Sequence, residues 1–129
     1  METNLKKKFR FREFRVYKDA RIFSEELKDL SKIKFPKGEQ FSLLSQLWRA
    51  LNSVILNIAE GSDRSTDKDF ALFLNRAHTS LNEVVSCLDI AHDRKYITED
   101  KHSLHLHKAA DLADQLTAFR TRLLKTPTK

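Results

Sequence analysis

Side chains that could carry out acid–base or metal chemistry are present, but none completes a recognisable catalytic site. Glu60 and Glu83 could act as paired carboxylates, although nothing else in the sequence supports that role. His102, His105 and His107 cluster at the start of a predicted helix, where no Cys or carboxylate set completes a metal-ligand pattern. A solvated helix face explains these histidines more simply. We therefore expect no enzymatic activity, no bound metal and no cofactor.

Residue counts disfavour two further classes of site. The chain has only two glycines, whereas a loop that cradles nucleotide phosphates needs several to bring its backbone close. Its one cysteine, Cys87, shares the apolar face of a predicted helix with Val84 and Ala91. We therefore expect Cys87 to be a core thiol and not a nucleophile.

The segment FRFREFR, residues 9–15, alternates aromatic with charged residues and could bind nucleic acid. Arginine pairs with phosphates, and phenylalanine rings can stack on unpaired bases. The alternative is that Phe11 and Phe14 pack onto the fold as an N-terminal lid. Both interpretations leave the arginines of this segment available for contact with a phosphate.

Positive charge is concentrated at the two ends of the chain. The first 21 residues hold eight Lys or Arg against three Asp or Glu, and the last ten hold four Lys or Arg and no acid. The stretch between them is slightly negative, although the whole chain carries +6. An anionic partner such as RNA would suit this pattern. The phosphate contacts we expect are Arg10, Arg12, Arg15, Arg120, Arg122 and Lys125. The alternative is that the basic ends are solvated tails that only maintain solubility.

Helical spacing of apolar residues predicts four amphipathic helices and no strand. The segments are about 14–32, about 39–60 with Gly61 as a C′ residue, from Ser65 or Thr66 to about 94, and a fourth after the capping residue Thr98. Short connections between such helices favour an all-α, up-down-up-down four-helix bundle. The predicted organisation is a basic arm over residues 1–12, the bundle over 13–125 and a tail over 126–129.

The polar side of the second predicted helix is almost uncharged. Between Ser42 and Ala59, Arg49 is the only charged residue, in a chain of which a third is charged. Small neutral polar side chains suit a surface that a partner covers and that must still form hydrogen bonds. A Ser- and Asn-rich face in contact with water is the alternative. The third predicted helix repeats the pattern, which favours self-association through these two faces.

These same faces carry a family resemblance. The motif residues are Ser45, Arg49, Ser53, Asn57, Glu60, Gly61, Arg64 and Glu83. With the run Asn57-Ile58-Ala59-Glu60-Gly61 at its centre, the pattern resembles the small four-helix-bundle proteins encoded in intervening sequences of bacterial 23S ribosomal RNA genes. The likeness extends from about Phe11 to Leu124. Thr79-Ser80 stands where that family usually has Gly-Ser, and Trp48 where a smaller or basic residue is usual.

The resemblance implies a ring-shaped homopentamer in which the motif residues support the fold or the contacts between subunits. It implies no catalytic site. The accessory proteins of diversity-generating retroelements are similar, and they bind nucleic acid and a reverse transcriptase. The resemblance therefore implies binding of RNA, or of an RNA–protein assembly, through a basic face. A protein-interaction scaffold without affinity for nucleic acid is the alternative.

The expected location of the chain is the bacterial cytoplasm. One cysteine excludes an internal disulfide, and Lys6-Lys7-Lys8 is not followed by the apolar run of a signal peptide. The longest apolar runs are far shorter than the roughly 20 residues that a membrane-spanning helix needs. Trp48, at the edge of an apolar face, is expected to be mostly buried with its indole N–H bonded or at the boundary.

Overall fold

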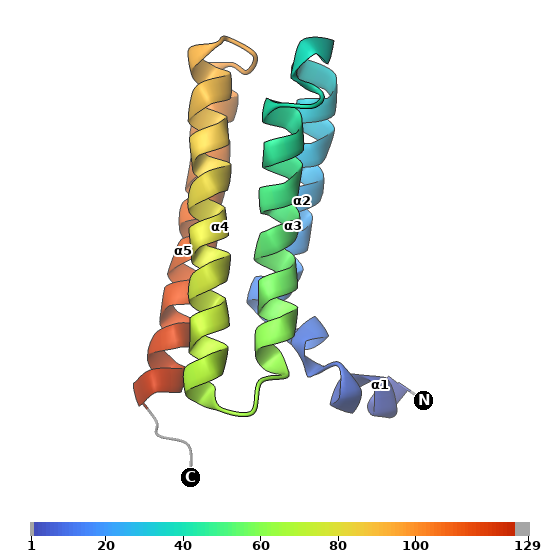
Figure 1. Cartoon of the computed structure of the whole chain (residues 1–129), viewed down its shortest axis with the longest axis vertical. Coiled ribbons are helices and arrows are strands. Elements are labelled where there is room, and N and C mark those ends of the chain that lie inside the picture. Colours follow the sequence, from blue (N-terminus) through green and yellow to red (C-terminus); the bar gives the residue numbers. More distant parts are fainter. Residues whose placement is uncertain (1, 126–129) are drawn as a thin grey trace.

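The computed structural model describes residues 2–125, and every regular element in that range is a helix (Figure 1). The elements are α1 (Glu2–Lys8), the 3-10 helix η1 (Arg10–Glu13), α2 (Arg15–Lys34), the 3-10 helix η2 (Lys37–Glu39), α3 (Leu43–Ser62), α4 (Asp67–Asp93) and α5 (Glu99–Lys125). The all-α prediction is confirmed. The predicted tail over residues 126–129 lies outside the described residues.

The four long helices lie side by side and share one apolar core. In Figure 1, α3 packs along α4 and α4 along α5, while α2 contacts both α3 and α5. Leucines that are almost completely buried meet at the centre, among them Leu27 of α2, Leu47 of α3, Leu74 of α4 and Leu116 of α5. Burying such side chains contributes roughly 1.5–3 kcal/mol each, which is what holds the helices together.

Two predicted helix starts are confirmed by their caps. The Thr66 hydroxyl accepts a hydrogen bond from the Asp69 backbone N–H at 3.1 Å, and α4 follows directly. The Thr98 hydroxyl accepts from the Lys101 backbone N–H at 3.2 Å, where α5 begins. Each threonine satisfies one of the N–H groups that a helix leaves unpaired at its start.

Two predicted boundaries are wrong. The second predicted helix begins later than expected, because residues 37–39 form the separate turn η2 and α3 starts at Leu43. Gly61 lies within α3 without a positive φ, so it is not a C′ residue. Its close packing against α4 explains the glycine instead, since a β-carbon there would lie 2.7 Å from Phe73 Cβ.

Trp48 and Cys87 support the predicted orientation of α3 and α4. The Trp48 ring is partly buried, and its indole N–H donates a hydrogen bond to the Ser31 hydroxyl of α2 at 3.0 Å. Cys87 is only 3% exposed, and burial raises the pKa of its thiol. A buried neutral thiol is a poor nucleophile, so the prediction of a core residue is confirmed.

A buried carboxylate fixes the end of the molecule opposite the start of α2 and the end of α5. Glu39 accepts hydrogen bonds from the Tyr96 hydroxyl and the Arg94 guanidinium, both at 2.6 Å. The Tyr96 hydrogen bond is the largest cause that lowers the pKa of Glu39. These contacts join η2 to the connection between α4 and α5, two segments that are distant in sequence. Nothing in the sequence pattern indicated this contact.

Candidate nucleic-acid interface and assembly face

The predicted phosphate contacts lie at one end of the molecule. Figure 1 shows that α2 and α4 begin there and that α3 and α5 end there. We call this the basic end, and its cations are Arg10, Arg12, Arg15, Arg64, Lys68, Arg120, Arg122 and Lys125. The structure thus brings together all six predicted contacts, from η1, α2 and α5. Arg64, in the turn between α3 and α4, and Lys68, in the first turn of α4, add to them.

Arg10 is engaged in packing within the chain. Its guanidinium donates a hydrogen bond to the Ser62 carbonyl at 3.1 Å. It also lies 5.5 Å from the centre of the Phe14 ring and 5.8 Å from that of Phe70. Arg10 therefore anchors η1 against the end of α3. Since a guanidinium has five N–H groups, some can still face a ligand.

The other predicted contacts are more accessible. Arg12, Arg122 and Lys125 are exposed, although the Arg122 guanidinium lies 5.2 Å from the centre of the Phe119 ring. Arg15 is exposed too, and its Nε is 3.3 Å from the Asp19 carboxylate. Exposed ion pairs of this kind contribute little, so a phosphate can compete for the guanidinium. Arg120 is half-buried.

Aromatic rings form a cluster beneath the basic end. Phe14 and Phe70 each meet Phe119 edge to face, with ring centres 5.3 and 5.1 Å apart, and Phe11 meets Tyr17 at 5.0 Å. These contacts agree with the lid interpretation of Phe11 and Phe14. Their rings are therefore occupied by packing and are not displayed for base stacking.

Arg76 is a cation near this end that the predicted contacts do not include. The guanidinium groups of Arg64 and Arg76 lie 5.0 and 4.6 Å from the centre of the Phe73 ring. Arg64 also contacts the Asp69 carboxylate at 3.3 Å. The spacing of Phe73 and Arg76, three residues apart on a helix, is a signal that could have suggested this stack.

Several motif residues join α3 to α4 within the chain. The Ser53 and Ser80 hydroxyls are 2.7 Å apart, and the Asn57 side-chain amide donates to the Ser53 carbonyl at 2.9 Å and hydroxyl at 3.0 Å. Arg49 and Glu83 form an ion pair at 3.6 Å. These residues account for part of the motif as support for the fold, without any second subunit.

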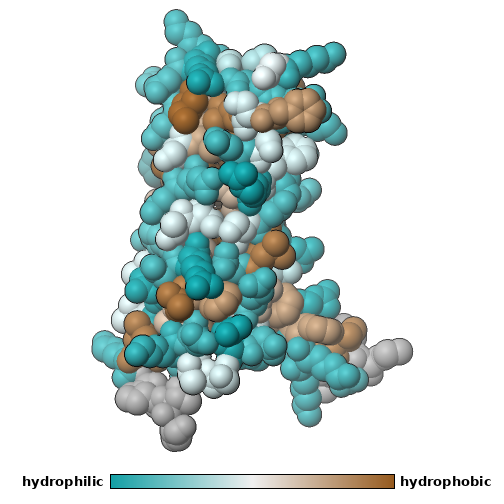
Figure 2. Space-filling view, in the orientation of Figure 1, coloured by the Kyte–Doolittle hydropathy of each residue, from teal (hydrophilic) through white to brown (hydrophobic). Residues whose placement is uncertain are grey.

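The remaining polar face of α3 and α4 is exposed. Ser45 and Glu60 of the motif are exposed, and the outer side of α4 presents Asn75, Thr79, Asn82 and Ser86. Three large apolar residues lie exposed on these two helices: Leu56 is 58% exposed, Leu72 46% and Ile90 37%. We call this surface the α3–α4 face. Figure 2 looks onto this side of the molecule and shows separate apolar areas with neutral and hydrophilic side chains between them.

The predicted solvated histidine face is wrong for His105. That side chain is only 5% exposed, packs near Phe23 with ring centres 6.5 Å apart, and has no partner for Nδ1 within the described structure. Burial lowers its pKa. The cause is helix phase, because His105 lies on the inner side of α5 with Ala109, Leu112 and Leu116.

The His102 side chain also contacts other residues of the chain. Its Nε2 lies 2.8 Å from the Asp89 carboxylate, and its ring stacks on His92 with centres 4.3 Å apart. Over residues 2–125 there is no group of three or more His, Cys, Asp or Glu that could hold a metal ion. Among the helices described, none has a stretch both long and apolar enough for a membrane span.

Comparisons with known proteins identify the family. Residues 12–118 match the family described as 23S rRNA-intervening sequence protein. A crystal structure from Bacteroides thetaiotaomicron, described as a protein with unknown function from the S23 ribosomal protein family, resembles the chain with a TM-score of 0.74. It is 22% identical and covers 81% of this chain and 97% of that chain, so the likeness concerns the fold. No curated protein matches the chain. The family match spans most of the sequence and confirms the resemblance carried by the motif, so the chain belongs to the family of 23S rRNA-intervening sequence proteins.

Proposed function

We propose that this chain is a non-enzymatic RNA-binding protein of the bacterial cytoplasm. Its working form is a ring-shaped homopentamer of up-down-up-down four-helix bundles, and RNA contacts the basic end. The observation that carries the proposal is the gathering of exposed cations from η1, α2 and α5 at one end, although they are distant in sequence. A family described by 23S rRNA intervening sequences agrees with an RNA partner.

The physical basis of the binding is phosphate neutralisation. Each cation that pairs with a phosphate releases counterions, so affinity falls as salt rises, with a slope of roughly −0.7 per phosphate for a single strand. A ring multiplies the number of basic ends on one assembly. Because these contacts read the backbone and not the bases, little sequence preference is expected.

A salt titration of RNA binding tests the proposal. The variant Arg12→Ala/Arg122→Ala/Lys125→Ala removes three exposed cations of the basic end and leaves the anchoring Arg10 in place. It should bind more weakly and show a shallower salt slope than the wild type. The matched control Lys32→Ala/Lys34→Ala/Lys37→Ala removes three exposed cations near the opposite end. That control should bind RNA like the wild type.

Two outcomes would reject RNA binding through the basic end. One is the absence of binding by the wild type at about 50 mM salt, where electrostatic association is strong. The other is the same loss of affinity and slope in the variant and in the control. The second candidate function is a protein-interaction scaffold, which the weakly charged α3–α4 face favours. A scaffold would keep its partner when the three cations of the basic end are removed.

A further inference from the structure

The short helix α1 and the residue that follows it, Phe9, present an apolar face that the described chain covers only in part, through an edge-to-face contact of the Phe9 ring with Phe11 of η1 at 6.4 Å between ring centres. Leu5 is 43% exposed and Phe9 45%. The Phe9 backbone N–H donates to the Leu5 carbonyl at 2.9 Å, so the two side chains lie one turn apart on the same face. Among the other elements, α1 contacts only η1. A seven-residue helix is marginal in water without packing, so this face needs a partner.

A groove between α2 and α5 has apolar and acidic lining residues that suit the apolar and basic side chains of this segment. Its volume is about 380 Å³, and Phe23 and Leu112 contribute to its lining. Two large apolar side chains, Ile22 of α2 and Leu104 of α5, line it and remain 59% and 45% exposed. We call it the α2–α5 groove. Each of the two helices thus contributes one exposed apolar side chain against which an apolar side chain of a partner can pack.

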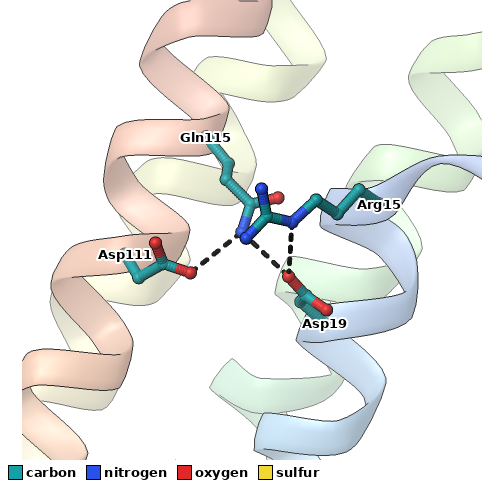
Figure 3. A network of polar contacts seen from close by, with 4 residues as sticks. All are labelled: Arg15, Asp19, Asp111 and Gln115. Carbon is teal, nitrogen blue, oxygen red and sulfur yellow. Dashed lines mark hydrogen bonds and ion pairs between the residues drawn. The ribbon is translucent and has the colours of Figure 1, made fainter.

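The charge of the groove is opposite to that of α1. Three carboxylates, Asp19, Glu26 and Asp111, line it against one cation, Lys108, which is paired with Glu26 at 2.8 Å. Figure 3 shows that Asp19 and Asp111 approach each other across the two helices, because both accept from the Gln115 amide at 3.0 Å. The Arg15 Nε also lies 3.3 Å from the Asp19 carboxylate, as an exposed ion pair. The last turn of α1, by contrast, holds Lys6, Lys7 and Lys8.

Two other surface grooves do not match in charge. The groove between α2 and α3 is lined by equal numbers of Lys or Arg and of Asp or Glu. The groove at the basic end is lined by Lys68 and Arg120 against Asp69, so it would repel a basic helix. A further groove, beside the connection between α4 and α5, is lined by three lysines against two acidic residues and does not match either. Charge complementarity thus selects the α2–α5 groove among the four.

A groove on the same chain is a poor destination for α1. Figure 1 shows α1 projecting from the side of the molecule away from α5. The segment that connects it to the bundle is fixed by the hydrogen bond from Arg10 to the Ser62 carbonyl and by the packing of Phe14 on Phe119. Moving α1 into its own groove would break these contacts, whereas docking on a second copy would keep them.

We propose that α1 of one copy binds in the α2–α5 groove of a second copy. Leu5 and Phe9 lie against Ile22 and Leu104, and the lysines of α1 face the carboxylates of the groove. The proposal rests on the self-association stated under the proposed function and names one contact that contributes to it, in addition to the α3–α4 face. Because arm and groove are different surfaces, the contact is head-to-tail and can close into a ring.

Disulfide trapping between two chains tests the contact. A chain with Leu5→Cys is co-expressed with a differently tagged chain with Leu104→Cys, and mild oxidation is followed by a non-reducing gel. We expect a covalent dimer that carries both tags. The matched control pairs Leu5→Cys with Ile33→Cys, which lies on α2 outside the groove and is 77% exposed. Native Cys87 is buried and remains in every chain.

A charge-reversal series adds a second measurement. Lys6→Glu/Lys7→Glu/Lys8→Glu should reduce trapping several-fold and shift the mass in light scattering towards a single chain. Adding Asp111→Lys to that variant should restore part of both signals, because the opposite charges again face each other.

The outcomes separate this inference from the proposed function. Equal trapping with Leu104→Cys and Ile33→Cys, or a disulfide only within one doubly substituted chain, would overturn docking on a second copy. An assembly of unchanged mass after deletion of residues 1–8 would overturn the α1 contact and leave self-association intact. A wild-type protein that is monomeric in solution would overturn both the α1 contact and the proposed self-association. A further outcome would assign α1 to RNA instead of to a second copy. In that case added RNA would abolish the disulfide trapping, and only RNA would protect the introduced thiol of the Leu5→Cys chain from labelling.

Discussion

Gly61 of α3 lies against Phe73 of α4 so closely that a β-carbon at position 61 would be 2.7 Å from Phe73 Cβ. It would also lie 2.9 Å from Cδ1 of Phe70. The nearest atom is attached directly to the α4 backbone, so it cannot move away as the end of a flexible side chain can. Gly61 therefore sets how closely the end of α3 approaches the start of α4, beneath the turn that carries Arg64.

Gly61→Ala should destabilise the protein. Alanine is favoured over glycine inside a helix by about 1 kcal/mol, but overpacking of a tight contact costs roughly 1–3 kcal/mol. We expect the steric cost to win and the melting temperature to fall. Gly38→Ala is the matched control, because nothing lies within 4 Å of a β-carbon at position 38. A Gly61→Ala protein that melts at or above the wild-type temperature would show that α3 and α4 can separate there without cost.

The contrast between Gly61 and the two capping threonines shows what the sequence could predict. Thr66 and Thr98 act on backbone groups three residues away, so their roles are visible in the local sequence. The packing of Gly61 depends on Phe70 and Phe73 of the next helix, and the phase of α3 against α4 decides it. The family motif included Gly61, but the motif alone could not show that close packing against α4 is what requires a glycine there.

In the candidate site too, some features could be predicted from the sequence and others could not. The cations of the basic end could be predicted, because antiparallel helices bring the start of the first and the end of the fourth together. The pairing of Ser53 with Ser80 inside one chain, the clamp at Glu39 and the burial of His105 could not. Each of these depends on which side chains of different helices face each other.

Lys95, two residues after the end of α4, has a backbone conformation that suits glycine. Its φ is 63°, and the Tyr96 backbone N–H donates to the Ala91 carbonyl at 2.9 Å, as in a helix ending with a left-handed residue. A side chain in that conformation costs about 1–2 kcal/mol. Lys95→Gly should therefore raise the melting temperature. Lys95→Ala is the control and should not, because it keeps the β-carbon. Equal melting temperatures for all three proteins would show that no strain is stored there.

Buried His105 should make stability depend on pH. Its pKa is lowered, first by burial and then by Lys108, so the unfolded chain binds a proton more readily than the folded one. Stability should then decrease as pH falls below the ordinary histidine value of about 6.5. In urea unfolding between about pH 7 and pH 5.5, where carboxylates do not yet titrate, the free energy of unfolding of His105→Leu should depend less on pH than that of the wild type. Exposed His107→Gln should keep the wild-type slope. An unchanged slope in His105→Leu would mean that another group causes it.

Self-association should be most sensitive at exposed positions of the α3–α4 face. Ser53 is a poor probe of the contact between subunits, because its hydroxyl already bonds with Ser80 in the same chain. A lysine there would disturb the bundle as well as any assembly. Asn82 is exposed on the outer side of α4, so Asn82→Lys leaves the core intact while burying an unpaired ammonium if a neighbour covers that face.

Light scattering then gives a direct answer. The wild type should have a mass several times 15.1 kDa, whereas Asn82→Lys should move towards a single chain with its helical circular dichroism unchanged. Thr117→Lys places the same charge on an exposed site of α5 and should keep the assembly. Dissociation by both lysines would point to general charge repulsion. An intact assembly in both variants would place the contact between subunits elsewhere, because a covered surface cannot take an unpaired charge without a loss of binding free energy.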